Sequence, residues 1–260
     1  MKKLILILLL SAISLSVLYF LLMPDIATLK KENPRKTSFM KYREREWERK
    51  GKRLKIIQIW TPLSRISPYL IKAVLIGEDD KFWKHEGFDY EAIQKALEKD
   101  IKAKRFKLGG STISQQLARN LYLSPSKNLL RKAAEALITW RMEKVLSKKR
   151  ILEIYLNVVE WGEGIFGAEA AARHYFGKSS FDLSPDEAAR LAAVLPNPRK
   201  YNAAGDQRYV VKRSNLIYSI MVRRGIVIPE YDEITEGGDS SSGPEINPPS
   251  LPIEKQKPAE

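Results

Sequence analysis

The spacing of the apolar residues is the feature that most constrains how this chain can fold. From about Arg65 to Gly225 they recur every three or four positions, which places them on one face of an α-helix. Alternation with a period of two, typical of a half-buried strand, is confined to Leu54–Trp60. The pattern therefore predicts a mainly α-helical domain. Its clearest apolar stripes are Ile113-Leu117-Leu121 and Leu130-Ala134-Ile138-Met142-Leu146.

Residues that cap helices mark several of the predicted boundaries. A last helix is expected over residues 206–224, because Gly225 can take the left-handed conformation that ends a helix. Helix starts are predicted by two capping boxes and one Ser-Pro pair: Thr112-x-x-Gln115, Ser184-x-x-Glu187 and Ser124-Pro125.

The first residues predict a membrane anchor. Residues 4–23 carry no charge, and a helix of this length spans the ~30 Å hydrocarbon core of a bilayer. No Ala-x-Ala-like cleavage site follows, so we expect the anchor to be retained. The predicted organisation is a cytoplasmic N-terminus (1–3), a transmembrane helix (4–23), a basic juxtamembrane linker (24–59), a helical domain (60–225) and a polar, disordered tail (226–260).

Composition excludes several chemistries. The chain has no cysteine and only two histidines, His85 and His174, so a cysteine nucleophile, a thiolate metal site and a multi-histidine metal site are excluded. The net charge of +14 includes a basic run over residues 29–55. Because this run follows the predicted anchor, anionic lipid headgroups are its expected partner, and nucleic acid is not.

The segment from Glu78 to Gly87 places acids, aromatic residues and a histidine together. An acidic helix end followed by a turn is the simpler interpretation of that composition. A carboxylate beside aromatic rings can, however, have its pKa raised into the range that suits a general base. Composition alone leaves both interpretations open.

A second polar cluster follows the glycine pair Gly109-Gly110. On a helix, Ser111, Gln115 and Arg119 fall on one line, and Thr112, Gln116 and Asn120 fall on the line beside it. An ordinary surface helix would carry Lys and Glu instead, so we favour a binding role. Glycines before a helix also let an anion approach its free N–H groups.

A third cluster carries several cations. Lys127, Arg131 and Glu135 are spaced by four, and Lys132 lies beside them. A salt-bridge ladder is the usual explanation of such a face. The same residues could hold a pyrophosphate, with Glu135 orienting the cations or binding Mg²⁺ or another divalent ion.

Taken together, these segments resemble the monofunctional biosynthetic peptidoglycan glycosyltransferases and the glycosyltransferase domain of class A penicillin-binding proteins. The likeness covers about residues 60–225, with Arg119 where the family usually has lysine. The matching motifs are, in chain order, Glu78-Asp79-x-x-Phe82-x-x-His85-x-Gly87, Gly109 to Asn120, Arg131-Lys132-x-x-Glu135, Lys148 to Asn157, and the alanine-rich stretch Ala188 to Pro196.

The resemblance implies a lysozyme-like helical fold and the polymerisation of lipid II into β-1,4-linked glycan strands, with release of undecaprenyl pyrophosphate. It implies that Glu78 and Glu135 are catalytic, with Glu78 as the base and Glu135 as a possible ligand of Mg²⁺. No organic cofactor is expected. The implied substrate-binding residues are Asp79, Phe82, His85, Ser111, Thr112, Gln115, Gln116, Arg119, Asn120, Lys127, Arg131 and Lys132.

The resemblance also implies a location and partners. Lipid II is polymerised at the outer face of the cytoplasmic (inner) membrane, which places the catalytic domain outside, although the lysines flanking residues 4–23 favour the opposite orientation. Expected partners are lipid II, the growing lipid-linked glycan chain, membrane lipids and other cell-wall synthesis or division proteins. Ser124-x-x-Lys127 fits the S-x-x-K of a transpeptidase, but no K-T-G or S-D-N follows.

Two other functions remain as alternatives. A lysozyme-like or lytic hydrolase would also use a glutamate, but a neutral polysaccharide needs no cationic clamp. A non-enzymatic membrane-anchored scaffold would leave the ordered motifs unexplained.

Overall fold

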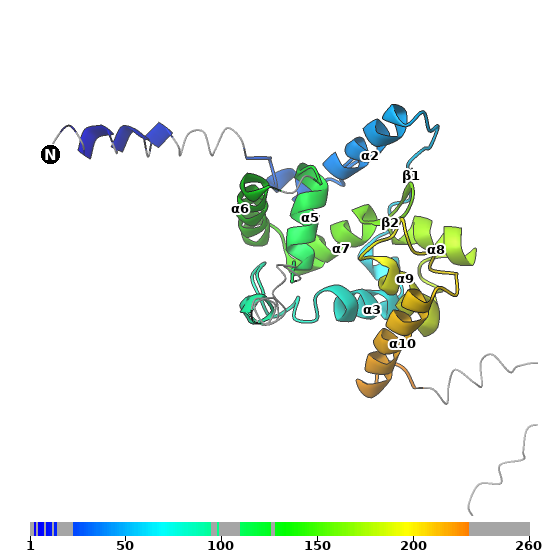
Figure 1. Ribbon diagram of the computed structural model, residues 1–260. Coiled ribbons are helices and arrows are strands. Elements are labelled where there is room, and N and C mark those ends of the chain that lie inside the picture. The colour runs from blue at the N-terminus through cyan, green and yellow to red at the C-terminus, as the bar shows by residue number, and fades with distance from the viewer. Residues whose placement is uncertain are drawn as a thin grey trace, which may run out of the picture. The chain divides into compact units, whose positions relative to one another are not determined.

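Figure 1 shows a computed structural model of the chain, which describes residues 3, 5–7, 9–11, 13, 14, 23–94, 98, 110–125 and 128–228. The described part is mainly helical with a few short strands, as the apolar spacing predicts. The elements are η1 (Ala27–Lys30), α2 (Ser38–Arg49), β1 (Ile57–Gln58), η2 (Leu63–Arg65), α3 (Pro68–Glu78), α5 (Ile113–Tyr122), α6 (Leu129–Val145), α7 (Lys148–Val158), β2 (Glu160–Gly162), β3 (Ile165–Phe166), α8 (Ala168–Phe176), α9 (Pro185–Val194) and α10 (Arg208–Arg223).

Helix α9 packs against both α3 and α10. Its alanines, including Ala188 and Ala192, are fully buried, and their small side chains allow the neighbouring helices to approach closely. The predicted capping box at the start of α9 is confirmed: the Ser184 hydroxyl accepts from the Glu187 N–H, and the Glu187 carboxylate accepts from the Ser184 N–H. This group of helices carries the C-terminal end of α3, where Glu78 lies.

Helix α5 packs against α2, α6 and α7. The capping box of Thr112 and Gln115 is confirmed at its start. The predicted apolar stripe is also confirmed, because Ile113 and Leu117 are fully buried and Leu121 is nearly so. On the polar side of α5, Gln116 contacts Glu78 of α3, and Arg119 lies near Glu135 of α6.

Helix α6 begins later than the sequence predicts. The expected start at Ser124-Pro125 is wrong, because the side chain of Asn128 accepts from the Arg131 N–H at 2.6 Å and caps the helix there. The second apolar stripe is only partly buried. Ile138, Met142 and Leu146 lie in the core, whereas Leu130 at the start of α6 is 85% exposed.

A three-stranded sheet with the order β1-β3-β2 lies beside α7 and α8. Strand β1 pairs in parallel with β3, and β2 pairs antiparallel with β3. The strand expected over Leu54–Trp60 is thus only two residues long. Asn157 holds the backbone shortly after β1 in place. Its side-chain amide donates to the Thr61 carbonyl and accepts from the Thr61 N–H, both at 2.8 Å.

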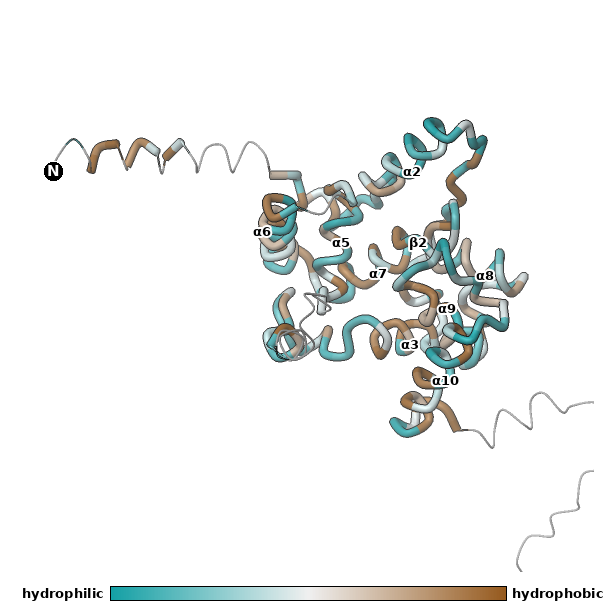
Figure 2. Tube along the Cα trace, in the orientation of Figure 1, coloured by the Kyte–Doolittle hydropathy of each residue, from teal (hydrophilic) through white to brown (hydrophobic). Residues whose placement is uncertain are grey.

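Part of the segment expected to be a basic linker packs on the core. Within residues 24–59, Ile26, Met40 and Trp47 are buried, and α2 contacts α5. The amphipathic character of α2 explains this packing. Figure 2 shows that the helix is predominantly hydrophilic, and its two buried residues, Met40 and Trp47, are apolar. The net charge of the whole segment does not reveal these buried apolar residues, so the sequence-based prediction of a linker missed the packing of α2.

Both ends of the predicted organisation fall largely outside the described residues. Most of the expected anchor (4–23) and almost all of the expected tail (226–260) belong to those parts. Among the residues that the structure describes, no helix combines the length and apolar character needed to cross a membrane. The last helix, α10, ends at Arg223, one residue before the predicted limit, and Gly225 has the positive φ of 65° expected there.

Candidate active site

Glu78 is the last residue of α3, and its side chain is 11% exposed. One carboxylate oxygen accepts from the Gln116 amide at 3.0 Å, and the other lies 3.2 Å from Nη2 of Arg213. Burial raises the pKa of Glu78 above its ordinary value of 4.5, although Gln116 and Arg213 each oppose the rise. Glu78 is therefore a partly desolvated carboxylate whose orientation is fixed by two neighbours.

Two residues that support this arrangement, Tyr155 and Arg213, were not identified as site residues from the sequence. Tyr155 of α7 is fully buried, and its hydroxyl donates to the Gln116 carbonyl oxygen at 2.9 Å. Arg213 of α10 also donates to the Gly77 carbonyl at 2.8 Å, so it braces the end of α3. Tyr155 lies within a motif shared with the resembled family, which is a usable signal. Arg213 looks like any arginine on an amphipathic helix.

Asp79 and His85 form an internal link. His85 Nδ1 accepts from the Gly87 N–H at 3.1 Å, so the ring proton lies on Nε2, which donates to Asp79 Oδ1 at 2.9 Å. The second oxygen of Asp79 accepts from the Ile113 N–H at 2.9 Å, at the start of α5. Both side chains are thus engaged within the protein, and they join the end of α3 to α5.

Phe82 lies in the core rather than on the surface of the site. Its ring is fully buried, and Nζ of Lys148 lies 4.5 Å from the ring centroid. Its neighbour Trp83 is 48% exposed and packs edge-to-face on Phe82, with 5.1 Å between the ring centroids. Phe82 therefore supports the loop that follows Glu78.

The two polar lines of α5 have different surroundings. Thr112 and Gln115 cap the helix, and the Thr112 hydroxyl also donates to the Gly87 carbonyl at 2.7 Å. Gln116 faces Glu78, one turn before Arg119 and Asn120. Ser111 lies just before the helix, with its hydroxyl oxygen 3.5 Å from Nζ of Lys132.

Glu135 lies at the centre of a cationic cluster, which we define as Arg119, Arg131 and Lys132. Its carboxylate is fully buried. Oε2 lies 2.7 Å from Nη1 of Arg131 and 3.8 Å from Nη1 of Arg119, and Oε1 contacts the Lys132 ammonium. The fourth expected cation, Lys127, lies outside the described residues. With three cations around one carboxylate, the cluster suits an anionic ligand.

The same arrangement does not fit a divalent metal ion at Glu135. Hard cations take several oxygen ligands, whereas both oxygens of Glu135 face cationic side chains. Among the described residues, no group of three or more His, Cys, Asp or Glu could hold a metal ion. Glu135 therefore orients the cationic cluster.

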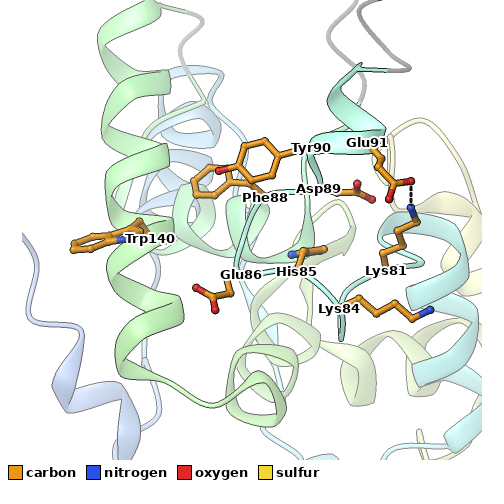
Figure 3. A pocket seen from close by; sticks show the side chains of 9 residues that line it. All are labelled: Lys81, Lys84, His85, Glu86, Phe88, Asp89, Tyr90, Glu91 and Trp140. Atoms are coloured by element: carbon orange, nitrogen blue, oxygen red, sulfur yellow. Dashed lines mark hydrogen bonds and ion pairs between the residues drawn. The ribbon is translucent and has the colours of Figure 1, made fainter.

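Several cavities lie near Glu78 and its neighbour Gln116. One, of about 240 Å³, is lined by Glu78, Ser111 and Thr112 among others, and shares Lys81 and Asp89 with a larger cavity of about 710 Å³. Figure 3 shows the larger cavity, which is lined by the rings of Phe88, Tyr90 and Trp140 and by charged side chains such as those of Lys84 and Glu86. Lys81 is paired there with Glu91. A third cavity, of about 230 Å³, is lined by Gln116 and Arg119.

Residues 48–222 match the family model described as "Transglycosylase". A "Biosynthetic peptidoglycan transglycosylase" of Azoarcus sp. (strain BH72) is 54% identical over 180 residues, which cover 69% of this chain and 78% of the relative. The protein of the same name from Dechloromonas aromatica is 51% identical over 189 residues, covering 73% and 82%. That from Methylobacillus flagellatus is 46% identical over 214 residues, covering 82% and 93%.

Proposed function

This chain belongs to the transglycosylase family, and from that premise we propose that it polymerises lipid II into the glycan strands of peptidoglycan. The observation that supports this most strongly is the pairing of two different carboxylates. Glu78 is partly desolvated and has a raised pKa, whereas Glu135 is surrounded by cations. A helical, lysozyme-like domain would hold these groups on either side of the bound sugar.

In the proposed reaction, Glu78 is the base. The C4 hydroxyl oxygen of one lipid II attacks the anomeric carbon at the lipid-linked end of the growing chain, and its proton passes to Glu78. The new C–O bond forms as the bond to the pyrophosphate oxygen breaks, with inversion from α to β. A raised pKa makes Glu78 a stronger base than an exposed glutamate.

The cationic cluster would stabilise the leaving group. Pyrophosphate departs with negative charge, so fixed cations lower the energy of the transition state more than an acid would. Arg119 and Lys132 are the accessible members, with side chains 30% and 42% exposed, and Arg131 is held more deeply. Because Glu135 neutralises only one of three charges, the cluster keeps a net positive charge for the ligand.

The rival hydrolase is less compatible with this site. A lysozyme-like enzyme cleaves a neutral polysaccharide and needs an acid to protonate the departing sugar. Nothing in such a reaction uses a cluster of cations. A lipid-linked pyrophosphate substrate uses both the base and the cluster.

We further propose that the enzyme is anchored by residues 4–23 in the cytoplasmic membrane, with its catalytic domain on the outer face. The surface near the larger cavity supports a membrane location. Tyr90 is 76% exposed, Trp140 is 51% exposed, and Leu129 and Leu130 lie uncovered at the start of α6. Aromatic and aliphatic side chains of this kind suit the boundary between water and lipid.

The deciding experiment is incubation of the purified protein with lipid II. We expect a ladder of lipid-linked glycan strands on a gel, and release of undecaprenyl pyrophosphate. The Glu78→Gln protein serves as the matched control, because it removes the base and keeps the shape of the side chain. Soluble fragments released from preformed peptidoglycan, without polymer from lipid II, would establish the hydrolase instead.

A further inference from the structure

The cavity of about 230 Å³ beside Gln116 is built partly by residues of α2 that precede the family match. Its walls come from α2, α5, β2 and the turn after α9. Phe39 and Arg43 of α2 line it, yet the match to the family begins only at residue 48. The N-terminal part of this chain therefore contributes to a cavity that also touches the candidate active site.

Positive charge dominates this cavity. Its charged lining residues are Arg43, Arg119, Arg199 and Glu160. Arg43 and Glu160 neutralise one another: Nη2 of Arg43 lies 2.8 Å from Glu160 Oε2, and Nε lies 3.0 Å from the same oxygen. Arg119 and Arg199 remain accessible, with side chains 30% and 28% exposed. An anionic ligand is the expected occupant.

Arg199 is held ready for such a ligand. Its Nη1 lies 3.1 Å from Oε2 of Glu46, an oxygen that also accepts from Arg43 at 2.9 Å. The other oxygen of Glu46, Oε1, accepts from Lys50 at 2.6 Å. Three cations share this one carboxylate, and their attraction lowers the pKa of Glu46 to about 2. Glu46 therefore positions Arg199 while it shares its negative charge with Lys50 and Arg43, and a second carboxylate oxygen, Oε1 of Glu163, lies 3.8 Å from Nη2 of Arg199.

We propose that this cavity binds a carboxylate of the peptide stem carried by the glycan substrate, and that Arg199 is the residue that recognises it. This inference rests on the proposed function. Gln116 places the cavity next to the chemistry, because its amide contacts Glu78 and its side chain lines the cavity. A planar guanidinium matches the two oxygens of a carboxylate, which suits Arg199 to this role.

A pyrophosphate is the other anion in the reaction, and its expected place is different. Arg131 and Lys132 lie on the Glu135 side of Arg119 and do not line this cavity. A lipid-linked disaccharide without a peptide stem keeps the pyrophosphate and loses the carboxylates. Comparison of the two lipids therefore separates the two sources of negative charge.

The test measures binding in the inactive Glu78→Gln background, with and without Arg199→Ala. We expect Arg199→Ala to weaken binding of intact lipid II roughly tenfold, the loss of one charge-assisted hydrogen bond. Binding of the stemless lipid should stay unchanged. Arg199→Lys, which keeps the charge but not the planar fork, should give an intermediate loss with intact lipid II only.

Arg173→Ala is the matched control, because Arg173 also pairs with a glutamate at the surface but lines a different cavity. It should affect neither lipid. Equal losses for both lipids on Arg199→Ala would assign the residue to the pyrophosphate or to the fold, and would overturn the proposal, as would no loss with either. Failure of the proposed function is recognised separately, since the unmodified protein would then make no polymer.

Discussion

The side-chain amide nitrogen of Gln116 lies 3.0 Å from Oε2 of Glu78. A hydrogen bond at the other end of the amide fixes its orientation, because the carbonyl oxygen of Gln116 accepts from the buried Tyr155 hydroxyl. The NH₂ group must therefore face the carboxylate. This chain of contacts holds the proposed base in one position before any substrate arrives.

Replacing Glu78 with Gln should reduce polymerisation by orders of magnitude while leaving the fold intact. Burial raises the pKa of Glu78 in the folded state, so its charge lowers stability as pH rises from the ordinary range through the raised pKa. At neutral pH the Gln variant should thus be no less stable than the parent. Activity and Tm, measured on the same preparation, check both statements. Near-normal turnover in a folded Glu78→Gln protein would eliminate the mechanism.

The dependence of kcat/KM on pH should show an acid limb above pH 4.5, the ordinary value for glutamate. The base acts only when ionised, and burial moves the pKa of Glu78 upward. Arg213 opposes that rise, so Arg213→Met should move the limb to higher pH. A pH–rate profile of both proteins measures this. An unchanged limb in the variant would show that Glu78 is not the group that titrates.

Asp79→Ala should act mainly on stability. The substitution leaves the Ile113 N–H without its acceptor at the buried start of α5 and removes the partner of His85. We expect a loss of roughly 2–4 kcal/mol in the free energy of unfolding, and a smaller loss for Asp79→Asn. Denaturant titration gives these values. A normal free energy with a raised KM would instead support the substrate contact that the sequence predicts.

Arg119→Ala should weaken binding of a pyrophosphate-bearing donor more than binding of a soluble disaccharide that lacks it. Arg119 is the member of the cationic cluster farthest from Glu135, at 3.8 Å, so its removal perturbs the fold least. The expected loss is about 1.5–3 kcal/mol of binding energy for the donor. Equal losses for both ligands, measured by titration, would mean that Arg119 only supports the structure.

A fusion of alkaline phosphatase behind Glu260 should be active, because that reporter folds only after export. The prediction follows from lipid II, which is polymerised outside the membrane, and it opposes the count of lysines beside residues 4–23. A cytoplasmic reporter at the same site is the control. If that reporter were active and the phosphatase silent, the proposed orientation would be wrong.

The resemblance to a known family, and no local spacing, indicated Glu78 as the proposed base. The sequence by itself determined the helical class and both capping boxes. These depend on neighbours a few positions apart, so local spacing encodes them. It failed at the start of α6, where Asn128 caps in place of Ser124, because both residue types suit an N-cap and the local pattern does not choose between positions four residues apart.

Only the tertiary structure decided which polar residues of the motifs cap or link helices and which contact Glu78. Sequence spacing places Thr112 and Gln116 on one line, yet Thr112 caps α5 while Gln116 faces Glu78. Asp79 follows Glu78 directly, but its carboxylate links α3 to the start of α5, whereas the carboxylate of Glu78 contacts Gln116 and Arg213. Arg213 contacts Glu78, which is 135 positions away in the chain. Arg43 contacts Glu160, which is 117 positions away. Contacts over such separations depend on how helices pack, and no local pattern carries that information.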